Sequence, residues 1–117
     1  MKKIYHLANC GTCQNILDDF GKAASGFEKQ DIKSQPITPS QLDEMKALAG
    51  SYEALFSRRA LKYRELGLNE KNLSEKDYRK YILEEYTFLK RPVVVNDKEI
   101  FIGNAPKVVA AAKASMK

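Results

Sequence analysis

The sequence has few of the residues on which metal sites and disulfide frameworks depend. Its 117 residues include two cysteines, one histidine and no tryptophan. A structural zinc site needs four ligands, and Cys10, Cys13 and His6 cannot complete such a set. A disulfide between residues three apart closes a very short loop and restricts the unfolded chain little. We therefore expect no metal and no other bound cofactor, and interpret the cysteine pair as redox-active.

Long apolar runs and blocks of one charge are also missing. No stretch approaches 18 consecutive apolar residues, and the first residues carry two lysines without the apolar run of a signal peptide. We expect a cytoplasmic protein that does not contact a membrane. The net charge is +5, but lysines and arginines are scattered among acidic residues. This favours a mixed-charge surface over a nucleic-acid-binding face, so we expect no direct nucleic-acid contact.

The two ends of the chain have strand and helix patterns. Residues 2–8 form a short apolar segment that suits a buried strand, and a helical pattern with one apolar face follows from Cys10 to Gly26. A weak, polar strand is expected at residues 27–32. Near the other end, two β-rich runs separated by residues 96–99 predict a hairpin, and a closing helix is expected at residues 106–114.

The middle of the chain is expected to be helical. Thr38 and Gln41 form a capping-box pattern with Pro39 at the first helical position, and Gly50 ends that helix. The helical pattern continues over residues 51–86 with a break at Gly67. Within it, Ser74 starts a further helix, with Asp77 at the third position.

Together these elements predict an α/β protein with a thioredoxin-like fold. A β-α-β unit is followed by a β-β-α unit, which is the thioredoxin arrangement. The length allows one domain. We expect a single domain over residues 1–117, with its core in residues 1–37 and 88–117 and a helical insertion at residues 38–87.

A strand that leads into a Cys-x-x-Cys motif at a helix start has a chemical consequence. Cys10 would lie at the helix N-terminus, where free N–H groups and the helix dipole favour a thiolate. Such placement lowers a cysteine pKa to ~3.5–7.5 from ~8.5. Cys13, one turn later, could attack a sulfur bonded to Cys10. The alternative is a pair of small, buried and unreactive side chains.

The motif also resembles that of a known family. Residues 5–15 (YHLANCGTCQN) are similar to the signature of arsenate reductases of the glutaredoxin-linked class. Further stretches resemble the family in the same order along nearly the whole chain: residues 35–38 (QPIT), 56–59 (FSRR), 63–68 (YRELGL) and 89–95 (LKRPVVV).

The resemblance implies a set of site residues. Cys10 would be the nucleophile, attacking an oxyanion or an electrophilic sulfur, and Cys13 would resolve the product. Arg59 and Arg91 would hold the anionic group, because a guanidinium offers a planar fork to oxyanions. Gly11 and Thr12, which follow the nucleophile, would belong to the substrate site. Electrons would come from glutathione with glutaredoxin, or from thioredoxin.

Three further residues are expected to support this site. In thioredoxin-like folds the proline that maps to Pro92 follows a cis peptide bond and faces the active cysteine. Asn9 belongs to the cysteine motif itself. His6 could lie beside Cys10 and favour its thiolate, or it could be a core residue bonded to the backbone. Both roles of His6 stay open.

The departures from the family pattern bear on the substrate. A third arginine of the family corresponds to Asn104, and Gln14 stands where Arg is common. Cys13 replaces the usual non-thiol residue and resembles the Spx branch, redox-sensing transcription regulators that bind RNA polymerase. We predict a thiol-dependent oxidoreductase that acts on arsenate, a related oxyanion or a disulfide. The alternative is an Spx-like regulator with a Cys-x-x-Cys switch.

Overall fold

The structure is a computed structural model that describes residues 1–116. The chain divides into two compact units, each described by itself below. Met1–Pro36 and the chain from Arg91 onward form the first, here called the sheet unit, and Ile37–Lys90 form the second, here called the helical unit. Every helix of residues 1–116 is too short or too polar to span a membrane.

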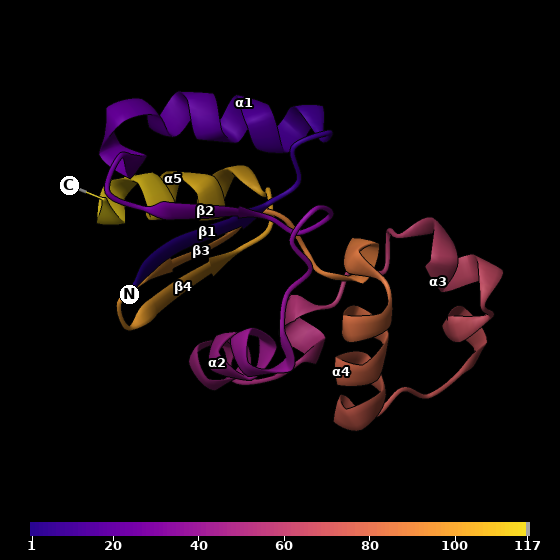
Figure 1. The fold of residues 1–117 in the computed structure, drawn as a ribbon. Coiled ribbons are helices and arrows are strands. Elements are labelled where there is room, and N and C mark those ends of the chain that lie inside the picture. Colours follow the sequence, from indigo (N-terminus) through magenta and orange to yellow (C-terminus); the bar gives the residue numbers. More distant parts are fainter. Residues whose placement is uncertain (117) are drawn as a thin grey trace. The chain divides into compact units, whose positions relative to one another are not determined.

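The sheet unit has the strand arrangement that the sequence predicts. Its four strands lie in the order β2-β1-β3-β4. Neighbours β1 and β2 are parallel, whereas β3 is antiparallel to both β1 and β4. Helices α1 and α5 lie on the same face of this sheet (Figure 1). The bounds are β1 Lys2–His6, α1 Gly11–Phe20, β2 Glu28–Asp31, β3 Val93–Asn96, β4 Glu99–Ile102 and α5 Pro106–Ser115. This confirms the α/β, thioredoxin-like fold.

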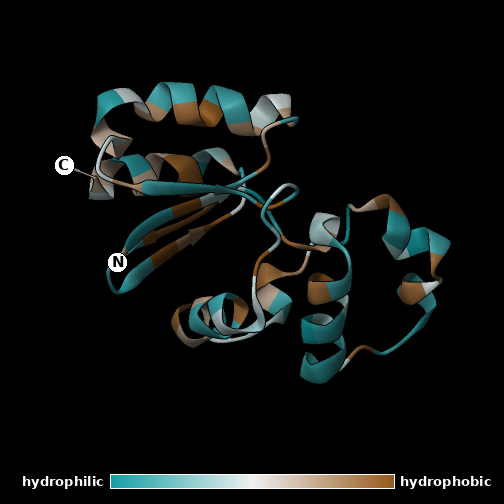
Figure 2. Cartoon of the chain, viewed as in Figure 1, coloured by the Kyte–Doolittle hydropathy of each residue, from teal (hydrophilic) through white to brown (hydrophobic). Residues whose placement is uncertain are grey.

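One core joins the two helices to the sheet. Ile4 of β1 and Val94 of β3 are paired across the strands and are almost fully buried. They belong to one cluster with Phe20 of α1 and Ala112 of α5. Figure 2 shows apolar and polar residues mixed along both helices, as expected when one face of a helix is buried. The apolar faces therefore fix α1, and with it the cysteine motif, on the sheet.

The β3–β4 hairpin is tighter than predicted. The sequence suggested a four-residue connection, but Asn96 pairs with Lys2 on one side and with Glu99 on the other. Only Asp97 and Lys98 remain for the turn, and Asp97 has a φ of 57°. Two-residue hairpin turns favour such a left-handed conformation, which aspartate tolerates better than most residues.

The helical unit contains the two capping boxes that the sequence predicts. Thr38 caps α2 (Pro39–Ala49) with Gln41, and Ser74 caps α4 (Glu75–Glu84) with Asp77. Gly50 ends α2 with a φ of 94°. These starts and stops were predictable because each depends on residues only three or four positions apart.

The helical pattern predicted over residues 51–86 is confirmed at the Gly67 break and in α4, but the residues before Gly67 contain less helix than expected. Between α2 and α4 the structure has only α3 (Leu61–Glu65) and two 3-10 helices, Glu53–Leu55 and Leu68–Glu70. The reason lies in backbone pairing. Phe56 forms an antiparallel bridge with Leu89, and the Ser57 N–H donates to the Phe88 carbonyl at 2.7 Å. Backbone groups used in this way cannot continue a helix.

The same pairing extends the helical unit beyond the expected insertion. The Lys90 N–H donates to the Leu55 carbonyl at 2.9 Å. Residues 88–90 therefore belong with the helical unit, whereas the sequence interpretation ended the insertion at residue 87. The first residue after this unit is Arg91.

Candidate functional site

Cys10 lies where β1 gives way to α1. It is the N-cap residue of α1, half-buried, with extended backbone angles of −104° and 113°. Its N–H donates to the Leu7 carbonyl at 3.1 Å, and its own carbonyl accepts from the Gln14 N–H at 3.1 Å. Ala8 and Asn9 form the exposed turn between strand and helix. The backbone thus places Cys10 at the positive end of α1.

This placement favours the thiolate of Cys10. The Cys13 N–H is the largest influence and lowers the Cys10 pKa below its usual value. Partial burial acts in the opposite direction, and the Cys13 side chain, the Thr12 N–H and the charge of Arg91 then lower the pKa further. Although the Cys10 side chain forms no capping hydrogen bond, the first N–H groups of the helix and a guanidinium stabilise its negative charge.

Cys13 differs from Cys10 because it is buried and its pKa is raised. Only 1% of its surface is exposed. Burial is the main reason that its pKa rises to about 11, and the neighbouring Cys10 raises it further. The motif therefore contains one accessible thiol that ionises easily and one buried thiol that does not. This is the order of acidity that the strand, Cys-x-x-Cys and helix pattern predicts.

Arg91 and Pro92 immediately precede β3. The Arg91–Pro92 peptide bond is cis, which confirms the expectation from the sequence. Val93 pairs with Tyr5, so Arg91 and Pro92 precede β3 at the end of the sheet where β1 stops. The positive charge of Arg91 lowers the pKa of both Cys10 and Cys13. Arg91 therefore contributes positive charge at the cysteine pair.

His6 is the last residue of β1. Its Nδ1 is buried and has no hydrogen-bond partner among residues 1–116. Burial lowers the pKa of His6, against an opposing effect of the Asp31 carboxylate. A neutral imidazole brings no positive charge to a thiolate. The expected hydrogen bond of a core histidine to the backbone is therefore not found at Nδ1 within the described part of the chain, and both predicted roles of His6 stay predictions.

The remaining predicted residues are exposed. Gly11 and Thr12 form the first turn of α1, and Asn9 precedes it. Arg59 belongs to the helical unit, in the segment before α3. Its neighbour Arg58 differs, because its guanidinium bonds to Glu53 at 2.8 Å. The sheet unit by itself thus assembles Cys10, Cys13 and Arg91, while a role for Arg59 stays a prediction.

Two polar contacts of the cysteine loop were not predicted from the sequence. Gln14 Nε2 donates to the Leu7 carbonyl at 3.3 Å, and the Ala8 N–H donates to Asp31 Oδ1 at 3.3 Å. Asp31 lies 23 residues from Ala8, so no local pattern indicates the contact. Within residues 1–116 no group of three or more metal-ligating side chains is found.

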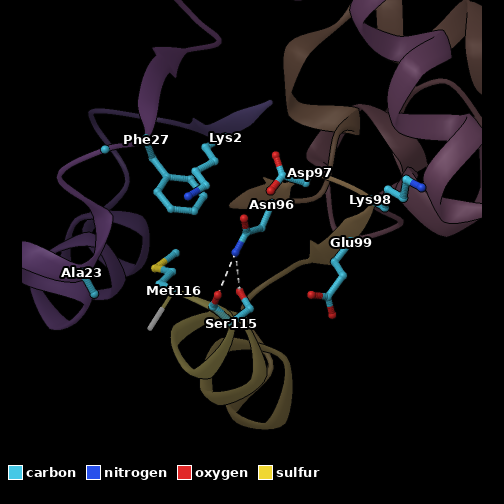
Figure 3. A pocket seen from close by; sticks show the side chains of 10 residues that line it. Lys2, Ala23, Phe27, Asn96, Asp97, Lys98, Glu99, Ser115 and Met116 are labelled. Carbon is cyan, nitrogen blue, oxygen red and sulfur yellow. Dashed lines mark hydrogen bonds between the residues drawn. The ribbon is translucent and has the colours of Figure 1, made fainter.

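A cavity of about 640 Å³ lies at the other end of the sheet unit (Figure 3). Its lining includes Lys2, Phe27, Asn96 and Met116, and no predicted site residue. Two residues of this lining are bonded to each other: Asn96 Nδ2 donates to the carbonyl and hydroxyl oxygens of Ser115 at 2.9 and 3.1 Å. Because Lys2 starts β1 and Cys10 follows its end, this cavity is separate from the cysteine site.

Comparisons with known proteins agree with the fold and motif. The sequence profile of the ArsC family matches residues 5–112, so the chain belongs to the ArsC family. It is 32% identical over 95 residues to an arsenate reductase of Escherichia coli, covering 79% of this chain and 66% of that protein. It is 26% identical over 105 residues to the global transcriptional regulator Spx 2 of Bacillus anthracis, covering 88% and 79%.

A solved structure supports the same fold. The arsenate reductase from Vibrio cholerae superimposes with a TM-score of 0.79 over 95% of this chain and 96% of that one, at 19% identity. The relatives of this chain thus include an arsenate reductase and a transcriptional regulator.

Proposed function

We propose that the chain is a thiol-dependent oxidoreductase in which Cys10 is the nucleophile and Cys13 the resolving thiol. The observation that carries this proposal is the contrast between the two sulfurs. Cys10 occupies the N-cap position of α1 and has a lowered pKa, whereas Cys13 is buried one turn later with a pKa of about 11. A reactive thiolate beside a protected thiol is the arrangement that two-step thiol chemistry requires.

On a disulfide substrate the proposed steps balance without a cofactor. The Cys10 thiolate attacks one sulfur, forms a mixed disulfide and releases the other sulfur as a thiolate. Cys13 loses its proton and attacks Cys10 Sγ, which expels the second substrate thiolate. The protein is left with a Cys10–Cys13 disulfide, and the substrate has gained two electrons.

An oxyanion substrate would follow the same order. Cys10 displaces a hydroxyl of arsenate as water and bonds to arsenic. Attack of Cys13 on Cys10 Sγ then leaves the bonding pair on arsenic, which departs as arsenite. Arg91 and the N–H groups of Gly11 and Thr12 would hold the anion, and the part expected of Arg59 stays a prediction. Gln14 and Asn104 occupy family arginine positions, so a substrate with less negative charge than arsenate also fits.

The oxidised protein needs an external reductant, and we propose glutathione with glutaredoxin, or thioredoxin. Each supplies the two electrons and protons that restore both thiols. Arsenate-dependent NADPH consumption, coupled through each donor system with its reductase, tests the proposal. Turnover that vanishes in Cys10→Ser and persists in Asp18→Asn, an exposed residue of α1, would support it. No turnover of arsenate or of a disulfide with either donor would overturn it.

The second candidate is an Spx-like regulator in which oxidation of the Cys-x-x-Cys pair changes binding to RNA polymerase. Similarity to Spx 2 over 88% of the chain, together with Cys13, favours it. Binding of the reduced and oxidised protein to the polymerase α subunit distinguishes the two. The regulator requires a redox-dependent difference in affinity, whereas the reductase requires catalytic turnover.

A further inference from the structure

The carboxylate of Asp31 joins two loops at one end of the sheet. Asp31 ends β2 and is paired with His6, which ends the parallel strand β1. Its Oδ1 accepts from the N–H of Ala8 at 3.3 Å and from that of Lys33 at 3.2 Å, and its Oδ2 accepts from Ser34 Oγ at 3.1 Å. Ala8 is two residues before Cys10, so the same carboxylate contacts the loop after β2 and the loop that carries the nucleophile.

The Ala8 contact complements the other bonds of the cysteine loop. The Leu7 carbonyl accepts from the Cys10 N–H and from Gln14, which fixes the loop to α1. The Ile32 N–H donates to the His6 carbonyl at 2.9 Å, which fixes the end of β1 to β2. Between these two anchors lies the exposed Ala8–Asn9 turn, and the Ala8 N–H bonds to the Asp31 side chain.

We propose that Asp31 is a positioning residue for Cys10: by holding Ala8, it keeps the β1–α1 turn in the conformation that places Cys10 at the N-cap of α1. This inference rests on the proposed thiol function. Asp31 itself is held in its ionised form. Desolvation opposes ionisation, but the hydrogen bonds from Lys33, Ala8 and Ser34 outweigh it and lower the Asp31 pKa. The ionised Asp31 carboxylate is therefore available to accept the hydrogen bond from Ala8 throughout the neutral pH range.

The two roles that Asp31 could have, through its charge or through the position of the loop, predict opposite changes in the pKa of Cys10. A carboxylate acting only through its charge would disfavour a nearby thiolate, so its removal would lower the Cys10 pKa. A carboxylate acting through the loop aligns Cys10 with the N–H groups of Thr12 and Cys13. Its removal would misalign them and raise the Cys10 pKa. The sign of the change therefore separates the two roles.

Three substitutions at Asp31 distinguish these roles. Asp31→Asn keeps an oxygen acceptor for Ala8 and loses the charge. Asp31→Glu keeps the charge and displaces the acceptor by one methylene group, and Asp31→Ala removes both. The measurement is the rate of iodoacetamide alkylation at Cys10 against pH, followed by peptide mass in the full chain, with the far-UV circular dichroism of each variant as a check on folding.

If Asp31 acts by position, Asp31→Glu and Asp31→Ala react roughly three to ten times more slowly than wild type near pH 7, with a raised Cys10 pKa. Asp31→Asn then stays close to wild type. Rates unchanged in Asp31→Glu, or a lowered Cys10 pKa in both Asp31→Asn and Asp31→Ala, would overturn the inference. An ordinary free-thiol pKa for Cys10 in the wild type would instead overturn the proposed function itself.

Discussion

Removing one cysteine at a time should expose the difference between the two thiols. At pH 7.5, a thiol with a pKa of about 11, as for Cys13, contains roughly 300 times less thiolate than one at ~8.5. A more basic thiolate is intrinsically more nucleophilic, which recovers about tenfold of this difference. Alkylation of Cys13 should therefore be roughly 30 times slower than that of a free cysteine, and burial slows it further.

Each single substitution also changes the surroundings, and so the pKa, of the cysteine that remains. Cys10→Ser removes the neighbouring sulfur that helps to raise the Cys13 pKa, but burial, the larger cause, remains. We expect Cys13 in that variant to be about tenfold or more slower than free cysteine. In Cys13→Ser, Cys10 should titrate below the free-thiol value. Alkylation rates against pH, measured on both variants, test this. Free-cysteine behaviour of Cys13, or a Cys10 pKa at or above the ordinary value, would refute the reasoning.

Three further changes have defined outcomes. Arg91→Lys should lower turnover of an anionic substrate, because lysine keeps the charge but loses the planar fork, while the thermal unfolding midpoint changes little; equal kcat/KM in the two proteins would remove Arg91 from the site. Phe56→Ala should lower the free energy of unfolding in urea by about 3–5 kcal/mol, because Phe56 is fully buried with the Tyr78 ring 4.9 Å away; a loss near zero would contradict this packing. The ionised Asp43 carboxylate accepts a hydrogen bond from Arg79, and this contact lowers the pKa of Asp43 to about 2. The contact therefore stabilises the fold fully at pH values above the pKa that Asp43 has in the unfolded chain, and this stabilisation is lost as pH falls toward 2. The stability difference between wild type and Asp43→Asn should therefore shrink on acidification, and a constant difference would exclude this linkage.

Elements set by neighbouring residues were predictable from the sequence. The capping boxes at Thr38 and Ser74 depend on side chains three positions apart, and both helices begin where these patterns place them. The Cys10 helix start was predictable for the same reason, since a strand pattern ends just before it. The cis bond at Pro92 came from the resemblance to the family.

Features set by distant pairing were not predictable in this way. Residues after Phe56 have a helical composition, yet the bridge to Leu89 diverts the backbone. The hairpin turn is shorter than predicted because Asn96 pairs with Lys2 of β1 and so belongs to β3. The contact between Asp31 and Ala8 likewise depends on the pairing of β1 with β2. Propensity and periodicity contain no information on such partners.

The central claim is that Cys10 reacts first and Cys13 resolves. The most direct measurement is to oxidise the reduced protein with one equivalent of glutathione disulfide and to map the products by peptide mass. The account predicts a Cys10–Cys13 disulfide in the wild type, a glutathione adduct on Cys10 in Cys13→Ser, and almost no adduct in Cys10→Ser. A stable adduct on Cys10 of the wild type without the internal disulfide, or preferential modification of Cys13, would contradict it.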